Sequence, residues 1–171
     1  RMMIGIGEAE GSVDASEADM LENIFRFGDS HMTAIMTPRP EIIWLERGTT
    51  YQEFLEVYRL HSHSRFPVYG ESIEDVIGVL SVKDIVLKAT QSIVQLDQDI
   101  TTDLRTAFFV PETKTVSETF TEMRVNGHSI ALTVDEFGGI AGIATLKQLV
   151  GIIVGEVTEE EGEPEDVLPL S

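Results

Sequence analysis

Two stretches of this sequence carry one pattern: "DVIGVLSVKDIV" at residues 75–86 and "GIAGIATLKQLV" at residues 139–150. They align without a gap, 64 residues apart. The matched pairs are Gly78 with Gly142, Ser81 with Thr145, Lys83 with Lys147 and Ile85 with Leu149, and the main chemical difference in the helical part is Asp84 with Gln148. Each stretch passes from an apolar run bounded by turn residues into a helical pattern, which predicts a strand leading directly into a helix, twice.

The repeat extends upstream, where the offset becomes 65 residues. Apolar residues recur at helical spacing from Tyr51 and again from Val116, which predicts amphipathic helices beginning near Thr50 and Thr115. Each unit therefore reads strand, helix, strand, strand, helix. The expected strands are residues 42–45, 66–69 and 76–80 in the first unit and residues 108–110, 130–134 and 140–144 in the second.

A unit of about 55 residues buries too little surface to be comfortably stable alone. We therefore expect an α+β fold in which two β-α-β-β-α repeats pack about a pseudo-twofold axis. The expected parts are an acidic N-terminal segment with a linker helix beginning near Ser16 (residues 1–35), a first repeat (36–91), a partly helical connector (92–104), a second repeat (105–154) and an acidic C-terminal tail (155–171).

The composition narrows the classes of function. The formal net charge is −18, and acidic runs at residues 8–22 and 156–166 supply most of it, as is typical of solvated chain ends. An anionic chain is a poor ligand for nucleic-acid backbones. The absence of cysteine excludes disulfides and thiolate sites. No apolar run reaches the roughly 18 residues of a membrane helix, and no secretory signal is expected, so the chain is predicted to be soluble.

The junction at Ser81 is a candidate anion site. A helix that starts at Val82 presents unpaired backbone N–H groups and a partial positive charge, which favour phosphate. Asp84, one turn later, can accept hydrogen bonds from the two hydroxyls of a ribose. The alternative is structural: Ser81 caps the helix and Asp84 is a favourable first-turn acid.

The matched junction of the second unit differs. Thr145 and Gln148 form the pattern of a capping box, in which the glutamine reaches back to the cap N–H. An amide accepts through one oxygen only, so ribose binding is less favourable there, although Thr145 can still meet a phosphate.

Several motifs occur in the same order as in a known family: "IMTPRPEIIWL" (35–45), "SRFPVYGES" (64–72), "VDEFGGIAGIATL" (134–146) and "LVGIIVGEVTEE" (149–160). With the tandem repeat, they resemble the pair of cystathionine β-synthase (CBS) domains in the CorC/HlyC family of membrane proteins, which is linked to magnesium and cobalt efflux and is also called haemolysin-like. In this family a transmembrane domain precedes the CBS pair, and a CorC/HlyC domain often follows it.

The resemblance implies a binding site for AMP or ATP, with or without Mg²⁺, between the repeats. Besides Ser81, Asp84 and Thr145, a phosphate site needs cations. The first candidate is Arg65, at the position where the family has an arginine before an apolar residue and proline, followed by Arg124, His128 and Lys83. Apolar groups from strand edges should enclose the adenine, and the candidates are Ile43, Val79 and Val110. Each cation could instead be a surface ion partner, and each apolar residue ordinary core.

The resemblance also implies a function without catalysis. The predicted function is a nucleotide-responsive regulatory module of a magnesium or cobalt efflux transporter, at the cytoplasmic face of the inner membrane. The predicted partners are an adenine nucleotide, a second copy bound through the CBS helices and the transmembrane domain of the parent chain. The alternative is a dimerisation or protein-interaction module that binds no nucleotide.

Overall fold

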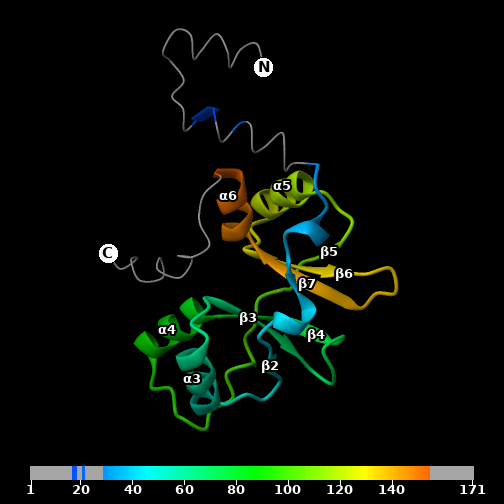
Figure 1. Ribbon diagram of the computed structural model, residues 1–171. Helices are drawn as coiled ribbons and strands as arrows, with labels where there is room; N and C mark the ends of the chain where they lie inside the picture. The colour runs from blue at the N-terminus through cyan, green and yellow to red at the C-terminus, as the bar shows by residue number, and fades with distance from the viewer. Residues whose placement is uncertain (1–16, 19–20, 22–28, 155–171) are drawn as a thin grey trace. The chain divides into compact units, whose positions relative to one another are not determined.

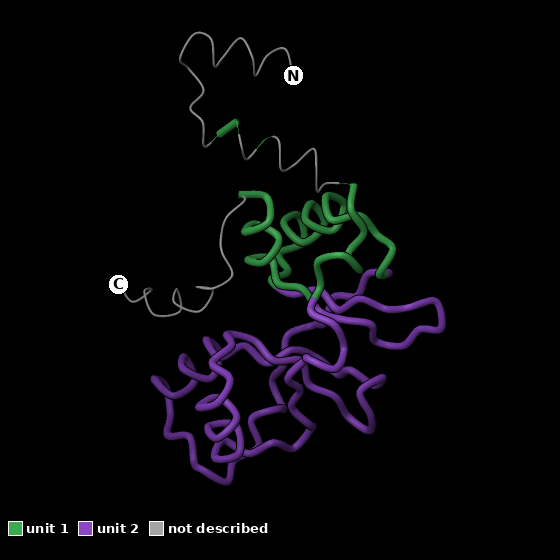
Figure 2. The backbone as a smooth tube through the Cα atoms, in the orientation of Figure 1, with its two compact units in different colours: residues 1–36, 112–129, 144–171 green, residues 37–111, 130–143 purple. Residues whose placement is uncertain are grey.

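The computed structural model describes residues 17–18, 21 and 29–154 (Figure 1). The predicted helix near Ser16 and the two acidic runs lie outside these residues, apart from positions 17, 18 and 21. The chain divides into two compact units (Figure 2): unit 1 holds residues 1–36, 112–129 and 144–171, and unit 2 holds residues 37–111 and 130–143. The domain boundaries expected from the repeat stay a prediction, as does the pseudo-twofold axis.

Unit 2 contains a three-stranded sheet with two helices. Its elements are β2 (Leu45–Glu46), α3 (Tyr51–Leu60), β3 (Arg65–Tyr69), β4 (Val76–Ser81) and α4 (Val82–Gln91). The strand order is β2-β3-β4, with β2 parallel and β4 antiparallel to β3. Phe54 of α3 joins Phe66, Val68 and Leu80 in the core, and each is at most 2% exposed. Burying side chains of this kind stabilises the fold by about 1.5–3 kcal/mol each.

A four-stranded sheet has the order β1-β7-β6-β5. Its strands are β1 (Thr37–Pro38), β5 (Phe109–Pro111), β6 (Ile130–Val134) and β7 (Ile140–Thr145), and a short 3-10 helix, η2 (Arg39–Glu41), follows β1. Within unit 2, Ile42, Leu132 and Ile140 form a second apolar cluster. An ion pair adds to it: Arg39 contacts Glu74 at 2.6 Å, and Glu74 also accepts from the N–H of Ile140 at 3.1 Å.

Unit 1 contains the other helices. Among its described residues these are η1 (Met32–Ala34), α5 (Val116–Asn126) and α6 (Leu146–Val154), and α5 and α6 lie side by side (Figure 1). Val116, Met123 and Leu149 are at most 1% exposed, so both helices contribute buried side chains. The α5 helix ends at Gly127, whose φ of 74° is a conformation that glycine adopts without strain.

The predicted helix starts are confirmed: Thr50 and Thr115 are N-caps, and α4 and α6 begin directly after Ser81 and Thr145. The predicted strand 42–45 is wrong, because Ile42 packs into the second cluster and pairing with β3 begins only at Leu45.

The prediction of a partly helical connector at residues 92–104 is also wrong, since no helix forms there. Its carbonyls instead bond to the start of α3: those of Gln98 and Leu96 accept from the N–H groups of Tyr51 and Gln52.

The repeated glycine marks a close approach of backbones. A Cβ on Gly78 would lie 2.8 Å from the Cβ of Leu104 and 2.9 Å from the carbonyl oxygen of Arg105. Its counterpart Gly142 pairs directly with Pro38 of β1. In both repeats, therefore, the strand before the second helix has a glycine where a neighbouring segment passes.

Candidate functional site: the start of helix α4

The start of α4 is shaped by two neighbouring segments. Because β3 and β4 are antiparallel, Arg65 lies opposite Ser81, and the N–H of Val82 donates to the carbonyl of Ser64 at 3.0 Å. On the other side Arg105 pairs with Val79 through two backbone hydrogen bonds of 2.9 Å. The absence of a side chain at Gly78 admits this segment.

The carboxylate of Asp84 is held by Arg105. The guanidinium donates from Nε to Oδ2 at 2.8 Å and from Nη2 to Oδ1 at 2.7 Å, a two-pronged ion pair. The Asp84 side chain is 33% exposed and that of Arg105 is 54% exposed, so solvent reaches both partners. Two-pronged pairs of this kind fix the orientation of the carboxylate as well as its charge.

Three cations act on this one carboxylate. The hydrogen bonds and charge of Arg105, with weaker contributions from Lys83 and Arg65, hold the pKa of Asp84 below its usual range. Burial lowers the pKa of Arg65, and the positive charge of Arg105 lowers it further. Among the described residues, neither Arg65 nor Lys83 forms an ion pair. The start of α4 therefore carries excess positive charge in a chain of net charge −18.

The structural alternative is correct in position, since Ser81 is the N-cap residue of α4 and Asp84 an acid of its first turn, but the side chain of Ser81 makes no capping hydrogen bond. Ser81 is only 3% exposed. In this conformation it shapes the start of the helix and presents little surface to a ligand.

The start of α6 has the capping box that the sequence predicts. The N–H of Gln148 donates to Oγ1 of Thr145 at 3.0 Å, and the N–H of Thr145 donates to Oε1 of Gln148 at 2.8 Å. Both side chains are thus used by the helix itself, although Gln148 remains exposed.

The adenine prediction needs correction for two residues. Val79 and Val110 are each 2% exposed, so they offer no apolar surface to a base in this conformation. Ile43 is partly exposed but packs against the core of the three-stranded sheet.

Two predicted phosphate ligands lie in unit 1. Arg124 is exposed on α5, with its guanidinium carbon 5.8 Å from the centre of the Phe120 ring, and His128 follows α5 and donates its backbone N–H to Met123. In unit 2 the structure brings together Arg65, Ser81, Lys83 and Asp84.

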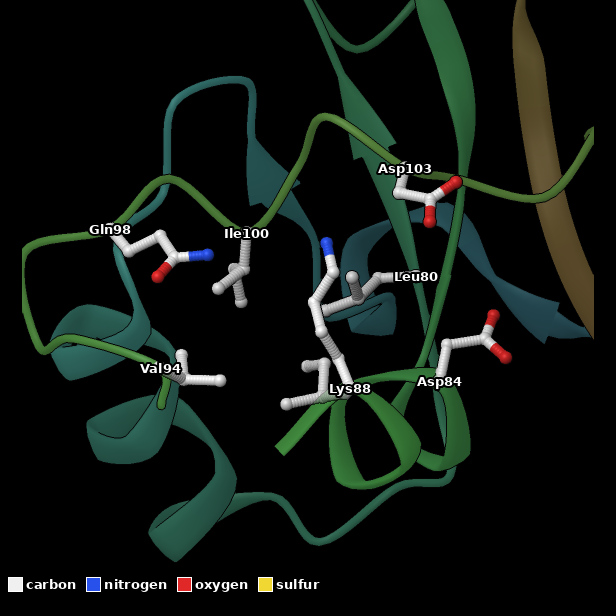
Figure 3. Close-up of a pocket in the computed structure, with 8 residues that line it drawn as sticks. Leu80, Asp84, Lys88, Val94, Gln98, Ile100 and Asp103 are labelled. Atoms are coloured by element: carbon white, nitrogen blue, oxygen red, sulfur yellow. The ribbon is translucent and has the colours of Figure 1, made fainter. Parts of the chain in front are cut away.

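Sequence reasoning missed Arg105, which lies 21 residues after Asp84, directly after the connector. It also missed a small hollow of about 30 Å³ beside Asp84 (Figure 3), which has room for little more than water. Its lining residues are Leu80, Asp84, Ile85, Lys88, Val94, Gln98, Ile100 and Asp103. In Figure 3, Lys88 extends from α4 toward the connector, whereas the Asp84 carboxylate points away from Lys88.

Comparison with known proteins agrees with this architecture. The family model for the CBS domain matches residues 32–89 and 98–155. The magnesium and cobalt efflux protein CorC of Salmonella typhimurium is 35% identical over 157 residues, covering 91% of this chain and 52% of CorC. The chain thus spans about half the length of this relative.

Solved structures extend the comparison. The CBS domain of a bacterial CNNM/CorC family Mg²⁺ transporter, in complex with ATP, is 34% identical with a TM-score of 0.74, covering 82% of this chain and 99% of that one. A CBS-domain pair with bound AMP from Klebsiella pneumoniae is 25% identical with a TM-score of 0.60, covering 73% and 98% of the two chains. The chain belongs to the CBS domain family, as a CBS domain pair of the CorC type.

Proposed function

We propose that this chain is a regulatory module that binds an adenine nucleotide at the start of α4. The observation that carries the proposal is the group of three cations, Arg65, Lys83 and Arg105, that act on the carboxylate of Asp84. This local excess of positive charge is suited to a phosphate, and the carboxylate is suited to a ribose diol.

The start of the helix adds to the electrostatic argument. Its first turn concentrates backbone N–H dipoles, and the hydroxyl of Ser81 does not satisfy them. The related transporter domain solved with ATP and the CBS pair solved with AMP support an adenine nucleotide as the ligand class.

As a regulator, the module would act on a membrane transporter of magnesium or cobalt, from the cytoplasmic face of the inner membrane, through the transmembrane domain of the parent chain. Within the described part of the chain, no helix is long and apolar enough to cross a membrane. A nucleotide can change the state of such a transporter only by binding one arrangement of the module more tightly than another.

The test is ligand binding by the chain itself. AMP, ADP and ATP, each with and without Mg²⁺, should raise the melting temperature in a concentration-dependent way, and calorimetry should give a saturable isotherm. A flat response to all three nucleotides in both measurements would contradict the proposal.

One observation favours a second function, dimerisation through the helices without nucleotide binding. Leu55 and Leu60 on α3 and Val86 and Leu87 on α4 are between 40% and 70% exposed. Exposed apolar side chains on helices are typical of protein interfaces. Sedimentation that shows a dimer, together with a flat response to nucleotides, would favour this function over the first.

A further inference from the structure

Arg105 occupies the part of Asp84 that a ribose would need. A carboxylate has one outer edge where both oxygens face the same direction, and the two prongs of Arg105 donate to both oxygens. The two hydroxyls of a ribose bind a carboxylate along the same edge, because they are also two neighbouring donors. Ribose and Arg105 therefore compete for Asp84.

The ion pair is weak enough to be exchanged. Its arginine is more than half exposed, and exposed ion pairs stabilise proteins by only about 0–1 kcal/mol. The backbone of Arg105 is held separately, by its two hydrogen bonds to Val79. Its side chain can therefore leave Asp84 while the backbone stays in place.

A phosphate offers Arg105 a new partner. Arg65 lies opposite Ser81 at the start of α4. Burial is the main cause of its lowered pKa, and the positive charge of Arg105 lowers this pKa further. An anion bound by both guanidiniums relieves the repulsion between these two charges. A ligand that carries both a diol and a phosphate thus gives Asp84 and Arg105 each a new partner in place of their ion pair. A nucleoside offers no new partner to Arg105.

Resting on the proposed function, we propose that Arg105 is the specificity-determining residue of the α4 site: it blocks Asp84 against ligands without a phosphate and transfers to the phosphate of a nucleotide.

The test compares adenosine with AMP in wild-type protein and in Arg105→Ala, by calorimetry of the whole chain. Wild type should bind AMP at least about tenfold more tightly than adenosine. In Arg105→Ala, AMP should bind about tenfold more weakly, because a ligand to the phosphate is lost. Adenosine should bind about two- to fivefold more tightly, because Asp84 is no longer occupied, and this follows from the strength of an exposed ion pair.

The two affinity changes expected in Arg105→Ala, weaker for AMP and tighter for adenosine, distinguish this role from a structural one. If Arg105 only positions Asp84 or supports the fold, both ligands weaken together and the AMP-to-adenosine ratio stays near its wild-type value; either result overturns the inference. Arg59→Ala, which removes an exposed arginine of α3, is the matched control and should leave the ratio unchanged. Arg105→Gln should repeat the result if the alanine variant does not fold.

Failure of the proposed function has a different signature. If wild type binds no nucleotide, both the function and the specificity role are wrong. If wild type binds AMP but the ratio does not change in either variant, only the role of Arg105 is wrong.

Discussion

The starts of α4 and α6 occupy matched positions of the repeat, yet their polar side chains face different partners. In α6 the hydroxyl of Thr145 and the amide of Gln148 are both bonded to the helix backbone. In α4 the hydroxyl of Ser81 does not cap, and Asp84 contacts Arg105, which follows the connector. At the same strand–helix junction, therefore, the side chains bond to their own helix in one repeat, whereas in the other the carboxylate bonds to another segment of the chain.

Side-chain length explains much of this difference. A glutamine has one more methylene than an aspartate, so its oxygen reaches back to the N-cap N–H. Glu53, which is equally long and holds the same position in α3, makes the same return bond to the N–H of Thr50 at 3.0 Å. Asp84 is shorter and makes no such bond, so its carboxylate remains for a partner from another part of the chain.

The largest expected effect is on nucleotide binding at the start of α4. Asp84→Ala should weaken AMP or ATP binding by about 1.5–3 kcal/mol, the range for a lost hydrogen bond to a charged group. Calorimetry measures it. Gln148→Ala is the matched control, and binding at the α4 site should change by less than about 0.5 kcal/mol. An unchanged affinity in Asp84→Ala would remove this carboxylate from the site.

The next effect concerns the glycine that admits the connector. Gly78→Ala should lower the free energy of unfolding by about 2 kcal/mol, because the added methyl group would overlap Leu104 and the backbone of Arg105. Urea denaturation measures it. As a control, Gly151→Ala in α6 meets no atom within 4 Å and should stabilise the protein by up to about 1 kcal/mol. Equal stabilities of Gly78→Ala and wild type would show that the close approach is easily relieved.

A smaller effect compares the two cap residues directly. Thr145→Ala should lower the free energy of unfolding by about 1 kcal/mol, since it removes the acceptor for the N–H of Gln148. Ser81→Ala should cost less than about 0.5 kcal/mol, because no capping bond is lost. The difference between the two variants is measured by thermal unfolding. Equal losses would mean that the two junctions are stabilised alike.

The smallest effect follows from the lowered pKa of Asp84. A carboxylate whose pKa is lower in the folded than in the unfolded chain stabilises the fold above the unfolded pKa, and this contribution is lost as the pH falls through the folded pKa. The difference in melting temperature between wild type and Asp84→Asn should therefore be positive near neutral pH and shrink below about pH 4. The pair is exposed, so its contribution to the free energy of unfolding should stay below about 1 kcal/mol. A difference that grows on acidification would contradict the assignment.

The sequence by itself determined the order of the elements, because helical and alternating apolar spacing are local properties and the second copy of the pattern repeats them. It also determined where α3 to α6 begin and that Thr145 and Gln148 form a capping box, since caps involve residues only three apart. The position of Arg65 at the start of β3 also follows from the local sequence.

Only the tertiary structure decided which groups meet Asp84. Arg105 lies 21 residues away and reaches the carboxylate because the connector runs beside β4 at Gly78, a path that depends on contacts between distant segments. Tertiary contacts also decided the structure of the connector, which forms no helix and whose carbonyls bond to the start of α3. They likewise decided the burial of Val79 and Val110, which no local pattern reveals. Spacing along a chain determines periodicity and capping, whereas long-range packing determines which charges become neighbours.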